Sequence, residues 1–375
     1  MFFDWLTMYQ DFPDVHFPML GDRASIVIDT ATGEHLGLRQ PSIQHAGSFC
    51  TSIQVRISNQ RITVSGNPSR YDRIDNLFGF TTLEECVGVY NRILLSLGLP
   101  PFSKCTQIFF RQGEDGQRVE KFSDGAVVTE IHVTSNRAVG QGSVPDYLKG
   151  LSTLRYRNSI PRLHTNGNTV DWLSKKGKAS LIYPSVYNKA EEIKLHTLNN
   201  IVRKYGDDSV EAKYLNRVIG YCELHGVSRH EQKFKSEFLR RHDMHFYGLF
   251  DPKGFKRFND EFLAIDDRLQ VTAMTLETVA DKLLRLGIVD NTRAAMTTSL
   301  YAMQWMHGQK FDFGKKQVQT HRARLRKIGI DIADTCDVSR HSPVYIRKAT
   351  EVVVRDLQIP AWYQLPQVHQ LRAVA

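Results

Sequence analysis

The sequence predicts an α+β fold in which an antiparallel sheet with flanking helices is followed by a mainly helical C-terminal region. Short runs rich in Val, Ile and Thr, separated by polar turns, are typical of antiparallel strands. These runs are mixed with predicted helices without regular strand–helix–strand alternation, which argues against a doubly wound parallel sheet. After residue 273 the apolar residues recur at helical spacing instead.

The strands are predicted near the N-terminus and again in the middle of the chain. The first runs are Ser25 to Asp29, Ser52 to Ile57 and Arg61 to Ser65. The later runs are Gln107 to Arg111, Glu120 to Phe122, Val127 to Thr134, Thr169 to Trp172 and Ala179 to Val186. Extended segments are also expected between Val218 and Phe234, whereas the glycine-rich stretch from Ser135 to Gly150 is expected to be a loop before a short helix.

Two helices are predicted among these strands from apolar residues at three- and four-residue spacing. The first begins after Thr81 or Thr82, either of which can cap it, and ends near Gly98. Its apolar positions are Leu83, Val87, Tyr90, Leu94 and Leu97. The second runs from Asn188 to about Lys204.

A domain boundary is predicted between Phe246 and Asn259, where Gly248, Pro252 and Gly254 interrupt the pattern. It divides the chain into a mixed sheet-and-helix region, residues 1–245, and a mainly helical region, residues 246–375. The helices expected in the second region are Leu276 to Leu286, Ala294 to Met306 and Lys315 to Ile328. The length of 375 residues agrees with two or three domains.

The composition is that of a globular protein with excess positive charge. Lys and Arg number 49 against 40 Asp and Glu, which gives a net charge of +9 and favours a polyanionic partner. The 14 Tyr, 20 Phe and 4 Trp residues would suit stacking on nucleic-acid bases. No apolar run is long enough to span a membrane, and the residues after Met1 lack the features of an export signal. We therefore expect a soluble protein in the cytoplasm.

Several common signatures are absent. Five scattered cysteines without C-x-x-C spacing are expected to be reduced thiols rather than disulfides or zinc ligands. The Gly177-Lys178 pair lacks the first glycine of a Walker loop, because Trp172 stands at that position, so an ATP-driven motor is not expected. The clustered His225, His230, His242 and His245, with Cys222, match no standard zinc spacing.

The first candidate motif lies where the predicted strand from Ala179 gives way to a helix. It contains Tyr187, Lys189 and Glu192. A tyrosine at an element boundary can be presented as a nucleophile, and Lys189 could neutralise a phosphate and favour the phenolate. The structural alternative is a strand-end aromatic followed by a surface Lys–Glu pair.

The second and third candidate motifs are strands. Alternation in the run from Val127 places Glu130, His132 and Thr134 on one face, where a carboxylate and an imidazole could bind one metal ion. The alternative is an ordinary histidine on a half-buried sheet. The run from Val227 places four charged residues on one side, as a metal-and-phosphate site would require, although a solvated edge strand explains them equally well. They are Arg229, Glu231, Lys233 and Lys235.

The fourth candidate is the predicted helix "KKQVQTHRARLRKIGI". Its apolar residues lie on one side and four polar or basic residues on another, which suits contact with a phosphate backbone or the major groove. The polar set is Lys315, Gln319, Arg322 and Arg326. Many ordinary surface helices share this pattern.

These segments occur in an order that resembles the filamentous-phage gene II/X replication initiators, which are rolling-circle endonucleases. The likeness begins with "GNPSRYDRIDNLFGFTTLEECVGVYNRILLSLGLP" and continues through "VVTEIHVTSNRAVG", "TVDW" and "YNKAEEI". It then includes "SRHEQKFKSEFL", "THRARLRKIGIDIADTCDV" and "IPAWYQLP". Each motif is short, but their order and spacing match over nearly the whole chain. Glu130 and His132 stand where the family typically has Arg and Asp.

The resemblance implies an antiparallel-sheet nicking endonuclease that acts on single- and double-stranded origin DNA. Tyr187 would form a 5′-phosphotyrosyl intermediate, and Lys189 would stabilise charge on the phosphate. His132 and Glu231, with Glu130, would hold Mg²⁺ or Mn²⁺. Arg229, Lys233, Lys315, Arg322 and Arg326 would contact DNA. The host helicase and polymerase would then act at the nick.

Three alternatives remain open from the sequence. Tyr183 is a rival nucleophile four residues before Tyr187, although Pro184 between them argues against equal exposure. The protein could instead be a non-catalytic DNA-binding regulator that uses its C-terminal helices. It could also be a plasmid-mobilisation relaxase, which shares the chemistry but acts at a transfer origin.

Overall fold

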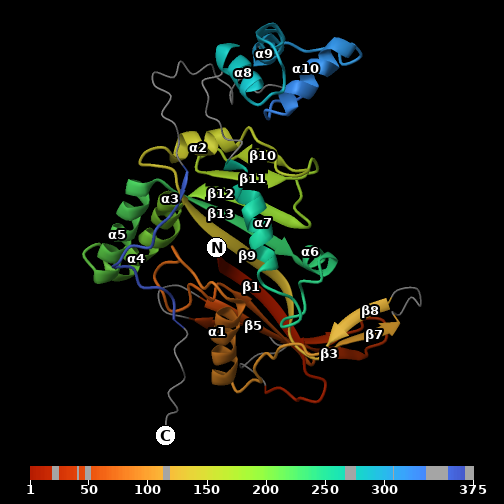
Figure 1. Ribbon diagram of the computed structural model, residues 1–375. Helices are drawn as coiled ribbons and strands as arrows, with labels where there is room; N and C mark the ends of the chain where they lie inside the picture. The colour runs from red at the N-terminus through yellow and green to blue at the C-terminus, as the bar shows by residue number, and fades with distance from the viewer. Residues whose placement is uncertain are drawn as a thin grey trace.

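The computed structural model describes residues 1–18, 25–39, 42–46, 52–112, 119–266, 276–306, 308–334 and 354–367 (Figure 1). Within these residues the strands gather mainly in one large antiparallel sheet with helices beside it, and further helices follow toward the C-terminus. The predicted α+β class is confirmed.

Twelve strands of the described residues form the large sheet. They are β1 (Phe2–Asp11), β2 (Ser25–Ile28), β3 (His35–Arg39), β4 (Ile43–Ala46), β5 (Ser52–Ser58), β6 (Arg61–Gly66), β9 (Val127–Ala138), β10 (Ile160–Leu163), β11 (Thr169–Leu173), β12 (Ile182–Asn188), β13 (Val227–Lys235) and β14 (Arg355–Asp356). The order is β10-β11-β12-β13-β9-β1-β6-β5-β3-β2, and β4 pairs with β5 and β14 with β9. The remaining strands, β7 (Ile108–Gln112) and β8 (Val119–Ser123), form a separate hairpin.

The helices of the first region are α1 (Leu83–Ser96), α2 (Val144–Leu151), α3 (Lys189–Ile193), the π-helical turn η1 (Lys194–Leu198), α4 (Asn199–Tyr205), α5 (Val210–His225), α6 (Ser236–Arg241) and α7 (Gly254–Leu263). Those after it are α8 (Leu276–Arg285), α9 (Thr292–Met306) and α10 (Lys316–Arg326). A capping box between Thr82 and Glu85 begins α1, which confirms that predicted helix and its cap. Among the described helices, none has both the length and the apolar character of a membrane span.

One face of the sheet is apolar and is covered by α1, α6 and α7 (Figure 1). Because side chains alternate along a strand, Ile131 and Val133 of β9 and Phe234 of β13 point to this face. There they join Tyr90 of α1 and Phe255 of α7 in the largest buried apolar cluster. The polar and charged residues between them therefore point to the opposite face, where the candidate site lies.

The segment from Val218 to Phe234 corrects the prediction of extended structure. It begins inside α5, and only the part from Val227 is a strand. Leu215, Val218 and Cys222 recur at three- and four-residue spacing and are buried together, so helical packing determines the local structure. The helix ends at Gly226, whose positive φ of 60° is the left-handed conformation that glycine adopts readily.

Three further differences concern element limits. The predicted loop from Ser135 begins as strand, because β9 continues to Ala138 and its part from Glu130 to Ala138 pairs with all of β13. The sheet also contains β1 at its centre, before the first predicted strand. The π-helical turn η1 interrupts the helix predicted from Asn188.

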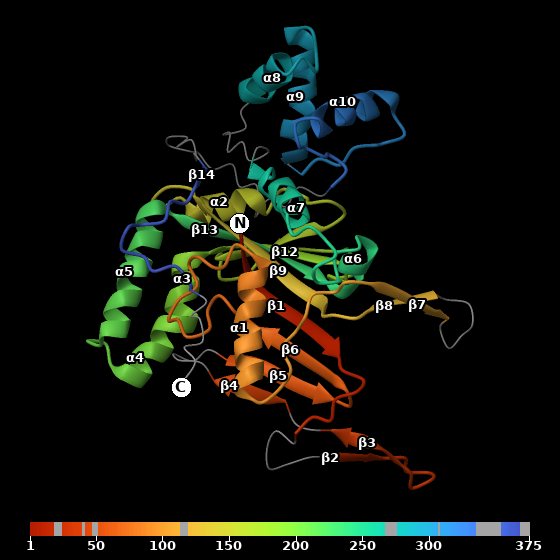
Figure 2. The same ribbon diagram turned by 60° about the horizontal axis from the view of Figure 1, so that its bottom comes forward.

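Buried apolar residues of α7 belong to the sheet region. Phe255, within the predicted boundary stretch from Phe246 to Asn259, and Phe262, just after it, both pack against that region. A separate cluster begins at Val279 and unites α8, α9 and α10 (Figure 2). Its helices confirm those predicted after residue 273.

Candidate active site on the polar face of the sheet

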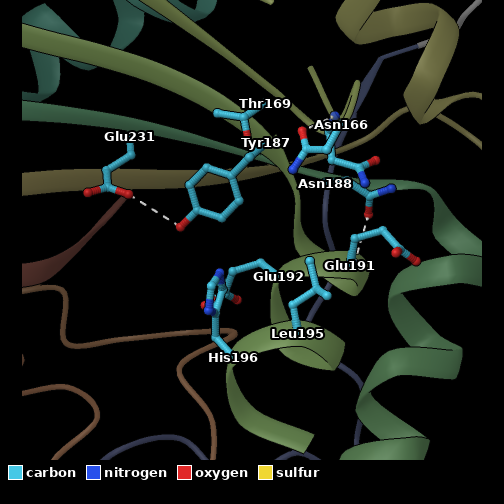
Figure 3. Close-up of a pocket in the computed structure, with 10 residues that line it drawn as sticks. Asn166, Thr169, Tyr187, Asn188, Glu191, Glu192, Leu195, His196 and Glu231 are labelled. Atoms are coloured by element: carbon cyan, nitrogen blue, oxygen red, sulfur yellow. Dashed lines mark hydrogen bonds between the residues drawn. The ribbon is translucent and has the colours of Figure 1, made fainter. Parts of the chain in front are cut away.

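Tyr187 lies one residue before the end of β12 and is half-buried. The strand register pairs it with Arg229 of β13 on one side and Thr169 of β11 on the other. Its hydroxyl donates a hydrogen bond to Glu231 Oε2 at 3.3 Å (Figure 3). Because β12 continues past Val186, the tyrosine projects from the sheet itself.

A cavity of about 280 Å³ lies beside the Tyr187 ring (Figure 3). Its lining residues are Asn166, Asn168, Thr169, Tyr187, Asn188, Glu191, Glu192, Leu195, His196 and Glu231. Asn188 follows the tyrosine and caps α3, because its Oδ1 accepts hydrogen bonds from the backbone N–H groups of Ala190 and Glu191. The cap fixes the start of the helix directly after the tyrosine, so the strand end and the cavity wall form one local unit.

Strands β9 and β13 bring together the three predicted metal ligands. His132 Nδ1 and Glu231 Oε1 are 2.9 Å apart, and His132 Nε2 and Glu130 Oε1 are 2.8 Å apart. Trp5 of β1 stacks on the imidazole, with ring centroids 5.8 Å apart and planes at 24°. The histidine is therefore held at both ring nitrogens and over one ring face.

The charges of this network oppose ionisation of the tyrosine. Burial favours the neutral form of Glu231, but the hydrogen bond and charge of His132 outweigh burial and lower the pKa of this carboxyl to about 2. Burial would lower the pKa of His132, but hydrogen bonds to Glu130 and Glu231 outweigh it and raise that pKa. Burial and the charge of Glu231 raise the pKa of Tyr187 well above its ordinary value. A phenolate beside this carboxylate would therefore need an additional cation.

Two lysines border the carboxylates on the same face of β13. Lys233 Nζ lies 3.4 Å from Glu231 Oε1, and Lys235 Nζ lies 2.5 Å from Glu130 Oε1. Their side chains are 28% and 34% exposed, so both ammonium groups lie at the margin of the network. From this margin they can reach a phosphate that approaches Glu231.

Lys189 and Arg229, by contrast, lie inside the fold. Lys189 is 0% exposed, and its Nζ donates hydrogen bonds to Asn76 Oδ1 at 2.8 Å and Glu192 Oε2 at 2.5 Å. Arg229 is also 0% exposed, and its Nη2 donates to the carbonyl oxygens of Asn76 and Leu77 at 2.6 and 2.8 Å. The structure thus differs from the expected exposed, DNA-contacting position of Arg229, because β13 is an interior strand and residues 76–77 cover that side chain.

Tyr183, the alternative nucleophile, belongs to a different cluster. It shares a face of β12 with Tyr187, but four residues of strand separate the two α-carbons by about 13 Å. Its hydroxyl donates a hydrogen bond to Asp171 Oδ2 at 2.7 Å. Burial and this carboxylate raise the pKa of Tyr183 to about 12. The two hydroxyls are thus bound to different carboxylates.

The basic residues predicted on the C-terminal helix lie on α10 or at its start. Lys315 and Arg326 are exposed, and Arg322 is half-buried. Asp331 Oδ1 accepts a hydrogen bond from Arg322 Nε at 2.6 Å, and Asp331 Oδ2 lies 3.7 Å from Arg326 Nε. Val318 packs inward, which leaves the basic side of the helix at the surface.

The donor set beside Tyr187 fits a divalent ion only in part. Within the described residues, no group of three or more His, Cys, Asp or Glu side chains is placed to hold a metal ion. Glu130 and Glu231 bind opposite nitrogens of His132, so the three predicted ligands do not converge. The Glu231 carboxylate and His132 Nδ1 do lie together. Mg²⁺ is commonly held by one or two carboxylates, with substrate phosphate and water completing its shell, and Glu231 fits such a site. His132 Nδ1 would join it only after giving up the proton that it shares with Glu231.

Sequence reasoning missed Trp5 and Asp171. Asp171 stands between the apolar Val170 and Trp172 in a predicted strand, and a lone acid in such a run indicates a carboxylate with a specific partner. Trp5 stacks on His132 only because β1 pairs with β9, which no local pattern predicted.

Comparisons with known proteins agree with the order of motifs. The family model for the N-terminal region of the phage gene II replication-associated protein matches residues 2–251, and the model of its C-terminal region matches residues 283–369. The replication-associated protein of Escherichia phage If1 is 50% identical over 314 residues, which cover 84% of this chain and 98% of that protein. No solved structure matches. The chain therefore belongs to the gene II replication-associated protein family, which confirms its resemblance to the filamentous-phage initiators.

Proposed function

We propose that this protein initiates rolling-circle replication of a single-stranded DNA phage by nicking the origin through Tyr187. The relative from phage If1 is named as replication-associated, and the net charge of +9 favours a nucleic-acid partner. The observation that carries the chemical part is the hydrogen bond from the Tyr187 hydroxyl to Glu231, beside a cavity on the polar face of the sheet.

The proposed reaction exchanges one phosphodiester for another. The phenolic oxygen of Tyr187 attacks the scissile phosphorus, the new O–P bond forms, and the bond from phosphorus to the 3′ oxygen breaks. The phenolic proton passes toward Glu231 Oε2, and the 3′ oxygen takes up a proton from water. The products are a 5′-phosphotyrosyl enzyme and a free 3′-hydroxyl. The reverse reaction rejoins the ends, so the chemistry requires no ATP.

Glu231 and His132 would hold a divalent ion, Mg²⁺ or Mn²⁺, with Glu130 binding the far nitrogen of the imidazole. When bound, such an ion supplies Lewis-acid polarisation of the phosphate. Its charge would also offset the carboxylate that now raises the pKa of Tyr187. Lys233 and Lys235 would add positive charge at the margin of the same site.

Lys189 and Arg229 are assigned a positioning role. Their hydrogen bonds connect α3, β13 and residues 76–77 behind the tyrosine. Two buried cations held in this way fix the backbone around Tyr187. Arg229 Nη1 makes no hydrogen bond, but it is buried 3.7 Å from Asp4 Oδ2 and does not reach the surface. Charge stabilisation of the phosphate would then come from Lys233 rather than Lys189.

Outside the sheet, Lys315, Arg322 and Arg326 are proposed to contact duplex DNA from α10. A nick with a free 3′-hydroxyl would be extended by the host helicase and polymerase, which places the protein in the cytoplasm of the bacterial host. Copying of the circle after nicking in a host extract would distinguish an initiator from a plasmid-mobilisation relaxase.

The test uses purified full-length protein and supercoiled DNA that carries the cognate phage origin, with Mg²⁺, Mn²⁺ or EDTA. We expect nicked circles and an SDS-stable protein–DNA adduct in the wild type with metal. Tyr187→Phe should abolish both, whereas the matched control Tyr183→Phe should retain the adduct. Binding without nicking in the wild type would favour a non-catalytic regulator. An adduct that persists in Tyr187→Phe and disappears in Tyr183→Phe would transfer the nucleophile to Tyr183.

A further inference from the structure

We propose that the polar face of β10, β11 and β12 binds the phosphate backbone of a single DNA strand that leads to Tyr187, with Arg162 as its principal phosphate ligand. This inference rests on the proposed function for the identity of the substrate. It adds a binding surface that adjoins the Tyr187–Glu231–His132 network and meets it at Lys233.

The surface is organised around Asp171 of β11, which is 0% exposed. Arg162 of β10 donates two hydrogen bonds to it, from Nε at 3.0 Å and from Nη2 at 2.6 Å. His164 Nε2 lies 2.9 Å from Asp171 Oδ2, and the Tyr183 hydroxyl donates to the same oxygen at 2.7 Å. One buried carboxylate thus fixes three side chains from the two neighbouring strands and the residue after β10.

The fixed side chains remain accessible on their outer side. The side chain of Arg162 is 56% exposed and that of His164 is 38% exposed. Two hydrogen bonds set the plane of the guanidinium, so little side-chain entropy remains to be lost when a phosphate binds. A buried acid that orients a largely exposed arginine is the arrangement expected of a preorganised anion site.

The strand register aligns this cluster with the nucleophile. Arg162 is paired with Asp171, Asp171 with Ser185, and Thr169 with Tyr187, so these residues share one face of the sheet. The cluster therefore reaches from His164, whose backbone N–H bonds to the carbonyl of Thr169, to Tyr183, four residues before Tyr187 on β12.

Further positive charge lies on the neighbouring strand β13 and on the turn between β11 and β12. Lys233 of β13 lies opposite Tyr183, with its Nζ 5.5 Å from the centre of that ring. The turn that joins β11 to β12 carries three exposed lysines, namely Lys175, Lys176 and Lys178. A row of cations along an extended surface matches the regular spacing of phosphates on a single strand.

The test measures binding of a fluorescently labelled oligodeoxythymidylate of about 20 nucleotides to the full-length protein in EDTA, by anisotropy over a range of salt concentrations. Each phosphate contact with single-stranded DNA contributes about 0.7 to the slope of log K against log salt. Arg162→Gln should reduce that slope by about 0.7 and weaken binding several-fold at low salt. The triple change of Lys175, Lys176 and Lys178 to Gln, confined to an exposed turn, should reduce the slope further without affecting the fold.

The matched control is Arg61→Gln. Arg61 forms the same two-bond fork with Asp11, at 2.6 and 2.8 Å, and its side chain is 46% exposed. Its partner Asp11 lies at the far end of β1, six residues along the strand from Trp5, or about 20 Å. We expect Arg61→Gln to leave the slope unchanged. Equal losses in both variants, or unchanged binding in Arg162→Gln and the triple variant, would overturn the proposal.

The outcome is distinguishable from failure of the proposed function. If the wild type forms no adduct on origin DNA but Arg162→Gln still lowers the salt slope, the nicking proposal fails and the binding surface stands. If the wild type nicks and both Arg162→Gln and the triple lysine variant bind the oligonucleotide normally, the nicking proposal stands and the surface is wrong.

Discussion

Glu231 is the residue that joins the parts of the candidate site. Its two carboxylate oxygens contact the Tyr187 hydroxyl on one side and His132 Nδ1 with Lys233 Nζ on the other. Because its pKa is held near 2 by His132, it is charged at neutral pH and opposes the phenolate. Under the proposed mechanism, a divalent ion or the lysines at the margin would supply the compensating charge. Loss of nicking in EDTA would show that the ion is required.

Lys189→Met tests whether Lys189 positions the site or acts on the phosphate. The change keeps most of the apolar stem and removes an ammonium that is 0% exposed, leaving Asn76 and Glu192 without their partner. We expect the free energy of unfolding, measured by urea titration and circular dichroism, to fall by about 2–3 kcal/mol.

The control for this change is Lys194→Met, five residues further along. Lys194 also pairs with two glutamates, Glu191 at 2.8 Å and Glu223 at 2.6 Å, but its side chain is 38% exposed. Its loss should cost less than about 1 kcal/mol. Unchanged stability in Lys189→Met together with loss of the adduct would instead support a direct catalytic role.

At the scale of elements, the passage from α5 to β13 positions four of the charged residues on the polar face. Gly226 makes this turn at φ 60°, and a Cβ there would overlap the carbonyl oxygen of Gly140.

Gly226→Ala should therefore lower the free energy of unfolding by more than about 2 kcal/mol, from left-handed strain plus the clash. Gly220→Ala, within α5 and with open space around it, should instead stabilise by up to about 1 kcal/mol. If thermal denaturation showed equal effects for the two variants, the turn would accommodate a side chain at residue 226.

At the scale of the whole molecule, the chain packs against the sheet region a second time after the C-terminal helices. β14 pairs with β9, and the chain that follows it runs beside α5 (Figure 2). In this segment Tyr363 is buried against α5 and residues 73–78. The cluster of α8, α9 and α10 is thus inserted between two parts of the sheet region rather than appended to it. The predicted second region, residues 246–375, therefore contains segments of the first core on both sides of that cluster.

Tyr363→Phe tests this closure. The Tyr363 hydroxyl donates to Asp75 Oδ1 at 2.7 Å and accepts from the Phe78 N–H at 3.0 Å, and both partners are buried. Removing this oxygen leaves the Phe78 N–H without its acceptor, whereas Asp75 Oδ1 keeps the hydrogen bond from the Leu77 N–H at 2.7 Å. We therefore expect a loss of about 1–3 kcal/mol in urea unfolding of the sheet region. Tyr221→Phe removes a more exposed hydroxyl that donates to the Gln358 carbonyl and should cost less than about 1 kcal/mol. If Tyr363→Phe lost no more free energy of unfolding than Tyr221→Phe, the packing of the C-terminal segment against the sheet region would contribute little to stability.

Local pattern determined the elements whose burial is periodic along the chain. Apolar spacing and a capping threonine were sufficient for α1, and β5 and β6 show alternating burial. These signals depend on neighbours within one turn or one strand. The order of motifs also determined the family. Alternation correctly placed Glu130 with His132 and Glu231 with Lys233 on common faces.

Only the tertiary structure decided which of those faces is covered and by what. Arg229 and Lys233 share a face of one strand, yet residues 76–77 bury the first while the second stays at the margin. In the same way, pairing of β1 with β9 brings Trp5 to His132, and pairing of β10 with β11 brings Arg162 to Asp171. The physical reason is that periodicity fixes the direction of a side chain relative to its own strand, whereas burial and hydrogen-bond partners depend on segments distant in the sequence.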